Sequence, residues 1–185
     1  MAEIPPVAPS NASTDEIMFS ASVREEQTHH GSREAYARRS LNGGFATSLS
    51  DDAIAFIGER ESAYLATASA DGQPYVQHRG GPRGFINVLD RQNIAFAEYP
   101  GNRQFISSGH LAENERAFLF LMDYANARRL KLWGMARVTH EPKLLASLGT
   151  APLTVKKAIV FTVRAVDWNC SKYIPRLVSQ QEDAK

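Results

Sequence analysis

Seven short segments that read as β-strands follow one another between residues 64 and 168, with only short helices between them. Parallel neighbours need a crossover connection of about a dozen residues or more, usually a helix, and this chain offers too few of them. We therefore predict a mainly β fold of the α+β class, an antiparallel barrel with short flanking helices. The expected strands are residues 64–68, 74–79, 85–89, 93–98, 117–122, 130–139 and 158–168.

Turn and capping residues define the connections. Asp71-Gly72 is the preferred pair for a two-residue hairpin turn, so it should join the first two strands. Residues 90–92 should join the third and fourth strands in a second hairpin. Ser50 can cap a helix whose first turn holds two acidic residues, which predicts a helix over residues 50–60. Further short helices are expected at residues 103–111 and 142–148.

Composition divides the chain into three parts. Residues 1–20 carry three prolines among Ser, Asn and Thr, which is typical of a flexible arm. Residues 21–60 are mostly polar and rich in helix formers, although Gly31 interrupts them. We expect a helical N-terminal extension there, part of it lying on a partner subunit. Residues 61–185 hold the strands and form the main domain.

Composition also excludes several classes of function. With 21 basic and 20 acidic residues the net charge is +1, so no nucleic-acid partner is expected. A single cysteine, Cys170, rules out an intramolecular disulfide, and the five histidines show no metal-type spacing. The start of the chain lacks a signal-peptide pattern, and no apolar run is long enough to span a bilayer. We therefore expect a cytoplasmic protein without a metal site or a membrane partner.

The segment Tyr99-Pro100-Gly101-Asn102-Arg103-Gln104 ends one strand and leads into an expected helix. Glycine permits a tight turn, Asn102 can cap the helix, and Arg103 places a fixed positive charge among unpaired amide donors. Such a turn can hold a phosphate group through charge-assisted hydrogen bonds. It therefore predicts a site for a phosphorylated cofactor; the alternative is an ordinary helix cap with an exposed arginine.

The second strand is loaded with hydrogen-bonding side chains. Alternation places Tyr75, Gln77 and Arg79 on one face, and Val76 and His78 on the other. Polar groups that face a barrel interior must be hydrogen-bonded, and a ring system with carbonyls and ring nitrogens would satisfy them. The alternative is a polar face turned to solvent.

The sixth strand has a cationic face. Alternation aligns Arg129, Lys131 and Trp133 against Leu130 and Leu132. Positive charge beside an indole suits an anionic aromatic ligand, through charge and through stacking. Equally, this face could be the solvent-exposed side of the strand.

The order of these segments resembles that of the pyridoxamine 5'-phosphate oxidase-like flavoproteins. The likeness covers about residues 61–170 and is strongest to the subgroup of pyridoxamine 5'-phosphate oxidase-related FMN-binding proteins. The blocks that carry it are the run Gln77-His78-Arg79-Gly80-Gly81, residues 114–124 and the pair Asn169-Cys170. The resemblance implies an FMN-binding split β-barrel, and a homodimer with two FMN sites at the subunit interface.

The resemblance also implies roles for single residues. The oxidases grip the phosphate with a Ser-Arg-Lys turn that falls here on Asn102, Arg103 and Gln104, so the arginine is kept. Gln77 stands where their flavin strand begins with an arginine, and Arg79 is expected to compensate. Their C-terminal Trp-Arg pair has no clear match here, so oxidation of vitamin B6 is not implied. The expected cofactor-binding residues are Gln77, His78, Arg79, Gly80, Tyr99, Asn102, Arg103, Gln104, Lys131 and Trp133.

These features lead to the hypothesis of an FMN-dependent oxidoreductase that acts on a small-molecule redox substrate, which the sequence does not identify. The flavin would supply the redox chemistry, so no side chain needs to be a strong nucleophile and no catalytic residue is assigned. Three alternatives stay open. They are a flavin store or sensor without turnover, a split barrel that binds deazaflavin or haem, and a dimerisation module with a vestigial site.

Overall fold

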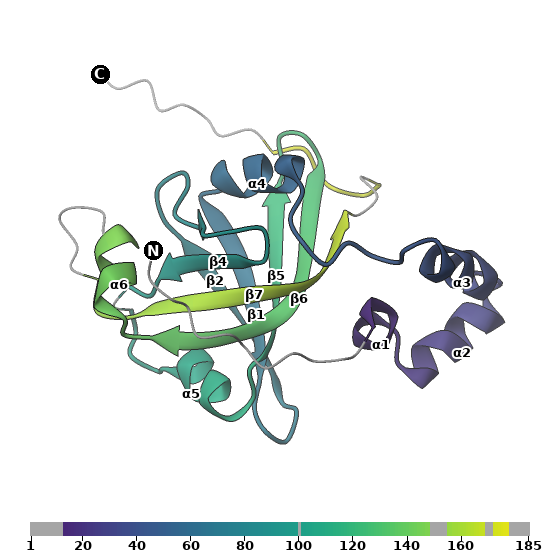
Figure 1. The fold of residues 1–185 in the computed structure, drawn as a ribbon, viewed down its shortest axis with the longest axis horizontal. Helices are drawn as coiled ribbons and strands as arrows, with labels where there is room; N and C mark the ends of the chain where they lie inside the picture. The colour runs from purple at the N-terminus through teal and green to yellow at the C-terminus, as the bar shows by residue number, and fades with distance from the viewer. Residues whose placement is uncertain (1–12, 100, 149–154, 169–171, 178–185) are drawn as a thin grey trace.

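The computed structural model describes residues 13–99, 101–148, 155–168 and 172–177. Within them, seven strands form one antiparallel sheet in the order β2-β1-β5-β6-β7-β4-β3, and this sheet curls into a half-barrel (Figure 1). The strands are β1 (Ser62–Ala68), β2 (Pro74–Gly80), β3 (Asn87–Val88), β4 (Asn93–Ala97), β5 (Arg116–Asp123), β6 (Arg128–Thr139) and β7 (Ala158–Trp168). The predicted mainly β, antiparallel fold with short flanking helices is confirmed.

The third strand is shorter than expected. Phe85 and Ile86 are both buried, at 8% and 2% exposed. Consecutive residues of a strand point to opposite faces, so two buried neighbours at the sheet edge favour a turn instead. The Phe85 amide accordingly donates to the Pro82 carbonyl, and regular pairing begins at Asn87.

The first hairpin has a three-residue loop, so the expected two-residue turn is wrong. The Ser69 amide donates to the Gln73 carbonyl and closes the loop around residues 70–72. Gly72 donates back to the Ser69 carbonyl and has φ +93°, the left-handed position that a three-residue hairpin loop gives to glycine. Asp71-Gly72 therefore marks the turn correctly but not its length.

The core lies on the inner face of the curled sheet. Every second residue of β1, of β5 and of residues 130–136 in β6 is buried there, as strand alternation requires. Helix α4 (Asp51–Gly58) packs Phe56 and Ile57 into the same cluster and lies across one end of the half-barrel (Figure 1). Burial of each such side chain contributes about 1.5–3 kcal/mol. The expected helix over residues 50–60, capped by Ser50, is confirmed.

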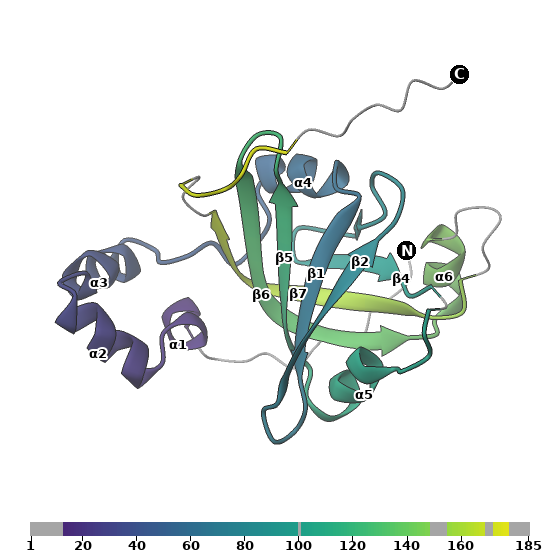
Figure 2. The same ribbon diagram turned by 180° about the vertical axis from the view of Figure 1, so that it is seen from behind.

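The N-terminal helices are α1 (Thr14–Met18), α2 (Ala21–His29) and α3 (Arg33–Leu41), with Gly31 at φ +72° between the last two. Neither α2 nor α3 buries a residue, and both project away from the sheet in both views (Figure 2). No helix was expected before residue 21. Helix α1 forms because Ser13 and Glu16 make a reciprocal capping box.

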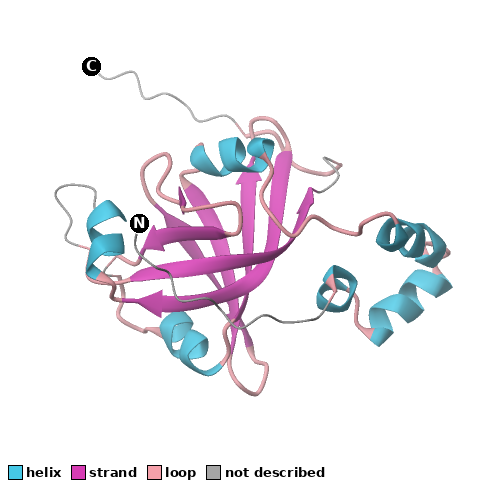
Figure 3. Ribbon diagram, viewed as in Figure 1, coloured by secondary structure: helices cyan, strands magenta, loops and turns pink. Residues whose placement is uncertain are grey.

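Two further helices flank the sheet, α5 (Ile106–Glu113) and α6 (Pro142–Leu148) (Figure 3). α6 matches the expected range and buries Leu144 and Leu148. No helix among the described residues combines the length and the apolarity that a membrane span requires.

Gly134 lies where the two long strands β6 and β7 pack closely together. The register of β6 against β7 shifts at Trp133/Gly134, and a Cβ on Gly134 would lie 2.3 Å from the Thr162 carbonyl oxygen and 2.5 Å from the Phe161 ring. Gly134→Ala should therefore lower the free energy of unfolding by about 3 kcal/mol, measured by urea denaturation. Gly109→Ala is the control, because its Cβ would meet no atom within 4 Å. That helical substitution should raise stability by about 0.5–1 kcal/mol. Equal stability of the two variants would contradict this packing.

Candidate functional site

A pocket of about 620 Å³ lies between the edge strand β2 of the curled sheet and the segment that follows β4. Its walls come from β2 at one edge, the segment after β4 near the other edge, the first turn of α5 and the segments that join β6 to β7. This volume is within the range of small-molecule and cofactor sites. The lining residues are Gln77, Arg79, Glu98, Tyr99, Gly101, Asn102, Arg103, Phe105, Ser107, His140, Lys156 and Lys157.

Arg79 is a largely buried cation in the wall of this pocket. It is 10% exposed, and its Nη1 lies 3.6 Å from Oε1 of Glu98. Its Nε and Nη2 atoms are buried and have no hydrogen-bond partner among the described residues. Burial lowers the pKa of the Arg79 guanidinium, and the nearby Glu98 carboxylate opposes that shift. Because buried donors without acceptors are costly, one edge of Arg79 is prepared for a ligand that carries acceptors.

Helix α5 orients the side chain of Gln77 through Ser107. Its side-chain oxygen accepts a hydrogen bond of 2.9 Å from the Ser107 hydroxyl, which is 1% exposed. With the oxygen engaged, the amide NH₂ group is the part of Gln77 that remains to donate to a ligand. Gln77 and Arg79 lie on the same side of β2, as predicted, and both line the pocket.

The turn after β4 differs from the expected helix start. Arg103 and Phe105 both have positive φ, at 61° and 55°, so helix α5 begins only at Ile106. Asn102 does not cap it, because the Asn102 side-chain oxygen accepts from the Gln104 amide two residues on. The prediction of a helix from residue 103 is wrong because this side-chain turn competes with the helix. Left-handed non-glycine residues cost about 1–3 kcal/mol each, and they are frequent at binding sites.

Positive charge predominates around the pocket. Four formally cationic side chains and one carboxylate line it among the described residues. Lys157 lies 3.0 Å from Glu98 and 4.6 Å from the centre of the Phe105 ring. His140 contacts the Lys156 carbonyl through Nδ1 at 3.1 Å. The excess of cations over carboxylates favours an anionic group on the ligand.

The structure thus brings half of the expected site residues together. Gln77, Arg79, Tyr99, Asn102 and Arg103 line the one pocket. Gln104 does not line the pocket. Its side-chain oxygen accepts a hydrogen bond of 3.0 Å from the side-chain nitrogen Nδ2 of Asn102, which does line it.

His78 and Gly80 do not line this pocket. His78 is exposed and packs edge-on against Tyr64, with ring centroids 5.7 Å apart. Gly80 adjoins it, since a Cβ there would lie 2.9 Å from the His78 ring. Both residues belong to the opposite side of β2, as alternation predicts for His78.

Lys131 and Trp133 lie at a different place. They border a hollow of about 320 Å³ beneath α1 and α3, where Lys131 pairs with Asp167 at 2.9 Å. The strand register pairs Gln77 with Leu65, Leu65 with Leu119 and Leu119 with Leu132, so Gln77 shares the buried face of Leu132. Within one chain, Lys131 and Trp133 therefore lie on the opposite face of the sheet from Gln77 and Arg79.

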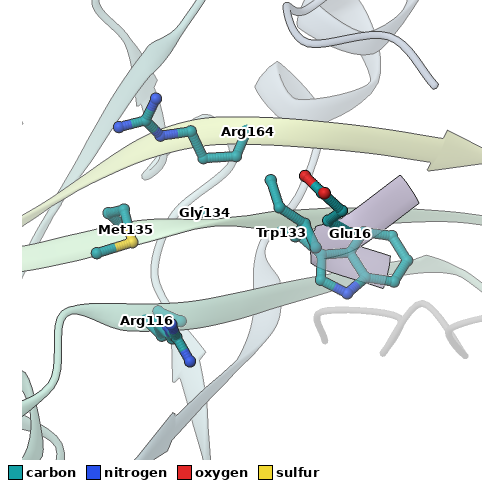
Figure 4. Close-up of a pocket in the computed structure, with 8 residues that line it drawn as sticks. Glu16, Arg116, Trp133, Gly134, Met135 and Arg164 are labelled. Atoms are coloured by element: carbon teal, nitrogen blue, oxygen red, sulfur yellow. The ribbon is translucent and has the colours of Figure 1, made fainter. Parts of the chain in front are cut away.

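Trp133 also borders a third hollow, of about 260 Å³. Figure 4 shows Arg116 and Arg164 on either side of the strand that carries Trp133 and Met135, with Glu16 beside the indole. The lining residues come from α1, β5, β6 and β7.

Several pocket residues carried no signal that sequence reasoning used. Ser107 and Phe105 lie in the stretch that was expected to be an ordinary helix, and Glu98 directly follows β4 without any motif. The adjacent lysines at 156 and 157 precede the last strand and were a visible signal of positive charge.

Cys170 lies outside the described residues. No group of three or more His, Cys, Asp or Glu side chains that could hold a metal ion is present among the residues that the structure describes.

Comparisons with known proteins agree with this architecture. The family model described as pyridoxamine 5'-phosphate oxidase matches residues 49–167, more than half of the chain. No curated protein matches the chain.

Three solved structures illustrate the shared fold. A Lactobacillus delbrueckii protein, described as a candidate pyridoxamine 5'-phosphate oxidase, is 17% identical with a TM-score of 0.53, over 66% of this chain and 95% of that one. HupZ of Group A Streptococcus is 13% identical with a TM-score of 0.53, over 64% and 92% of the two chains. A histidine-to-alanine variant of HupZ is 14% identical with the same TM-score, over 65% and 98%. The chain belongs to the pyridoxamine 5'-phosphate oxidase-like split-barrel family.

Proposed function

We propose that this protein is an FMN-dependent oxidoreductase that binds FMN in the pocket between β2 and the turn after β4. One observation carries the proposal: the buried, unsatisfied edge of Arg79 shares a pocket with the cationic turn at Arg103. FMN offers the groups that this pocket lacks, namely a phosphate ester for the cations and ring carbonyls and nitrogens for the buried donors.

The pocket residues fall into two groups that suit different parts of FMN. Arg103 and Lys156 are exposed cations at the pocket wall and are suited to the phosphate ester. Gln77 and Arg79 are more buried, carry fixed donors, and are suited to the acceptor atoms of the flavin ring. Bound there, the flavin would supply hydride or electron transfer, while these residues orient it and hydrogen-bond to its ring.

The placement of Lys131 and Trp133 supports a homodimer. Because they lie on the opposite face of the sheet from Gln77 and Arg79, they would contact the same flavin if a second subunit supplied them. The outer face of the sheet around Trp133 is rich in aromatic side chains. Phe118 packs against Trp133 and against Phe120, with ring centroids 4.8 Å and 6.3 Å away. We propose that a second copy of the chain covers this face.

The haem alternative depended on His78 as the histidine of the site segment. His78 lies on the exposed side of β2, away from the face that carries Gln77 and Arg79. The geometry therefore favours a flavin over a haem held by His78.

Replacement of Arg103 tests the phosphate contact. Arg103→Ala should weaken FMN binding more than tenfold, because it removes charge-assisted hydrogen bonds worth about 1.5–3 kcal/mol. Riboflavin, which lacks the phosphate, should bind both proteins equally in a fluorescence titration. Arg83→Ala is the matched control, since Arg83 is an exposed arginine outside the pocket. Unchanged FMN affinity in Arg103→Ala would remove the assignment.

Mixed dimers test the shared site. If Arg103 of one subunit and Lys131 of the other act on one flavin, co-refolding Arg103→Ala with Lys131→Met gives mixed dimers that hold one intact site each. Random pairing then restores about a quarter of all sites. An FMN titration that saturates only tight sites counts them, with each variant refolded separately as the control. The shared site is disproved if co-refolding restores no tight sites.

Turnover separates an enzyme from a flavin store. FMN-loaded protein should oxidise NADH or NADPH steadily in the presence of an electron acceptor, with many turnovers per flavin. Free FMN at the same concentration sets the background rate. A rate no higher than this background with either nicotinamide would favour the store or sensor instead.

A further inference from the structure

The pocket contains one acidic side chain that the proposed function does not use. Glu98 is 9% exposed and lies among four cationic side chains. A carboxylate repels the phosphate that such a pocket is proposed to hold, so its presence needs a physical reason.

Glu98 forms ion pairs with two cations at once. Its Oε1 lies 3.6 Å from Nη1 of Arg79, and its Oε2 lies 3.0 Å from Nζ of Lys157. The Ser108 hydroxyl lies 3.1 Å from both carboxylate oxygens and 3.2 Å from the Lys157 ammonium. The carboxylate is therefore held from several sides, and it fixes both cations relative to each other.

This arrangement divides the cations of the pocket into two electrostatically different groups. Arg79, Lys157 and Glu98 together carry a formal charge of +1, and the carboxylate already acts as the counter-ion of this group. Arg103 and Lys156, in contrast, are exposed cations. A small dianion that approached Arg79 would also approach Glu98, whereas a neutral acceptor such as a ring carbonyl would meet only the buried Nε and Nη2 donors.

We propose that Glu98 is a specificity-determining residue that reserves the Arg79–Lys157 pair for neutral acceptor groups and keeps free phosphate from binding to it. A phosphate ester is thereby directed to the exposed cations Arg103 and Lys156. This inference rests on the proposed function only in taking the ligand to be a phosphate ester with a polar ring. Discrimination arises here from an unfavourable contact with the wrong ligand rather than from a stronger contact with the right one.

Inorganic phosphate is the probe, titrated by calorimetry into the flavin-free protein. Glu98→Gln keeps the shape of the side chain but leaves Arg79 and Lys157 without a counter-ion, so phosphate should bind at least tenfold more tightly than to the wild type. Glu61→Gln is the control, because Glu61 is an exposed acid outside the pocket and its replacement changes the net charge equally. Its phosphate affinity should equal that of the wild type.

A double variant separates the effect of the lost charge on phosphate binding from an effect of misfolding. Glu98→Gln with Lys157→Gln removes one charge of each sign, so the formal charge of this group of three side chains returns to +1 and phosphate affinity should return to within threefold of the wild type. If circular dichroism shows that Glu98→Gln alone is unfolded, the double variant decides: wild-type affinity supports the inference, and a change above tenfold in either direction overturns it. Unchanged or weaker phosphate binding in folded Glu98→Gln also overturns it.

Titration of FMN into the wild type in the same series distinguishes the two proposals. Tighter phosphate binding in Glu98→Gln, together with no FMN binding by the wild type, would uphold the role of Glu98 and reject the proposed cofactor. If the wild type binds FMN but Glu98→Gln binds phosphate no more tightly than the wild type does, the proposed cofactor is upheld and the role of Glu98 is rejected.

Discussion

The contact between Arg79 and Glu98 joins one edge of an open sheet to a segment near its other edge. Arg79 belongs to β2 at one edge, and Glu98 directly follows β4 near the other edge, so the curl of the half-barrel brings them to 3.6 Å. The turn with Arg103 follows Glu98 in sequence and is thereby placed beside β2. The candidate site depends on this closure, because without it the donors of β2 and the cations of the turn would lie on separate edges.

The same contact explains why the site is prepared for a ligand before one arrives. Glu98 engages one nitrogen of Arg79 and leaves Nε and Nη2 buried without a partner among the described residues, while Ser107 fixes the amide of Gln77. Arg103 and Phe105 keep left-handed backbone conformations in the adjoining turn. Fixed donors and a strained turn together cost stability in the free protein, and a ligand with matching acceptors would recover it.

Strand alternation and turn residues were sufficient to predict the sheet and to place Gln77 and Arg79 on one face. They were insufficient where a local side chain competes with regular structure, as Asn102 does with the start of α5. Pairing between distant strands is also invisible to local patterns. Glu98 had no signal for this reason, and Lys131 was grouped with residues from the opposite face of the sheet.

A crystal structure of the protein grown with FMN tests the central claim most directly. The account predicts flavin in the pocket between β2 and the turn after β4, with an oxygen or nitrogen of the ring within about 3.2 Å of Nε or Nη2 of Arg79. FMN bound elsewhere, or an Arg79 edge that faces only water while the flavin is bound, would contradict it.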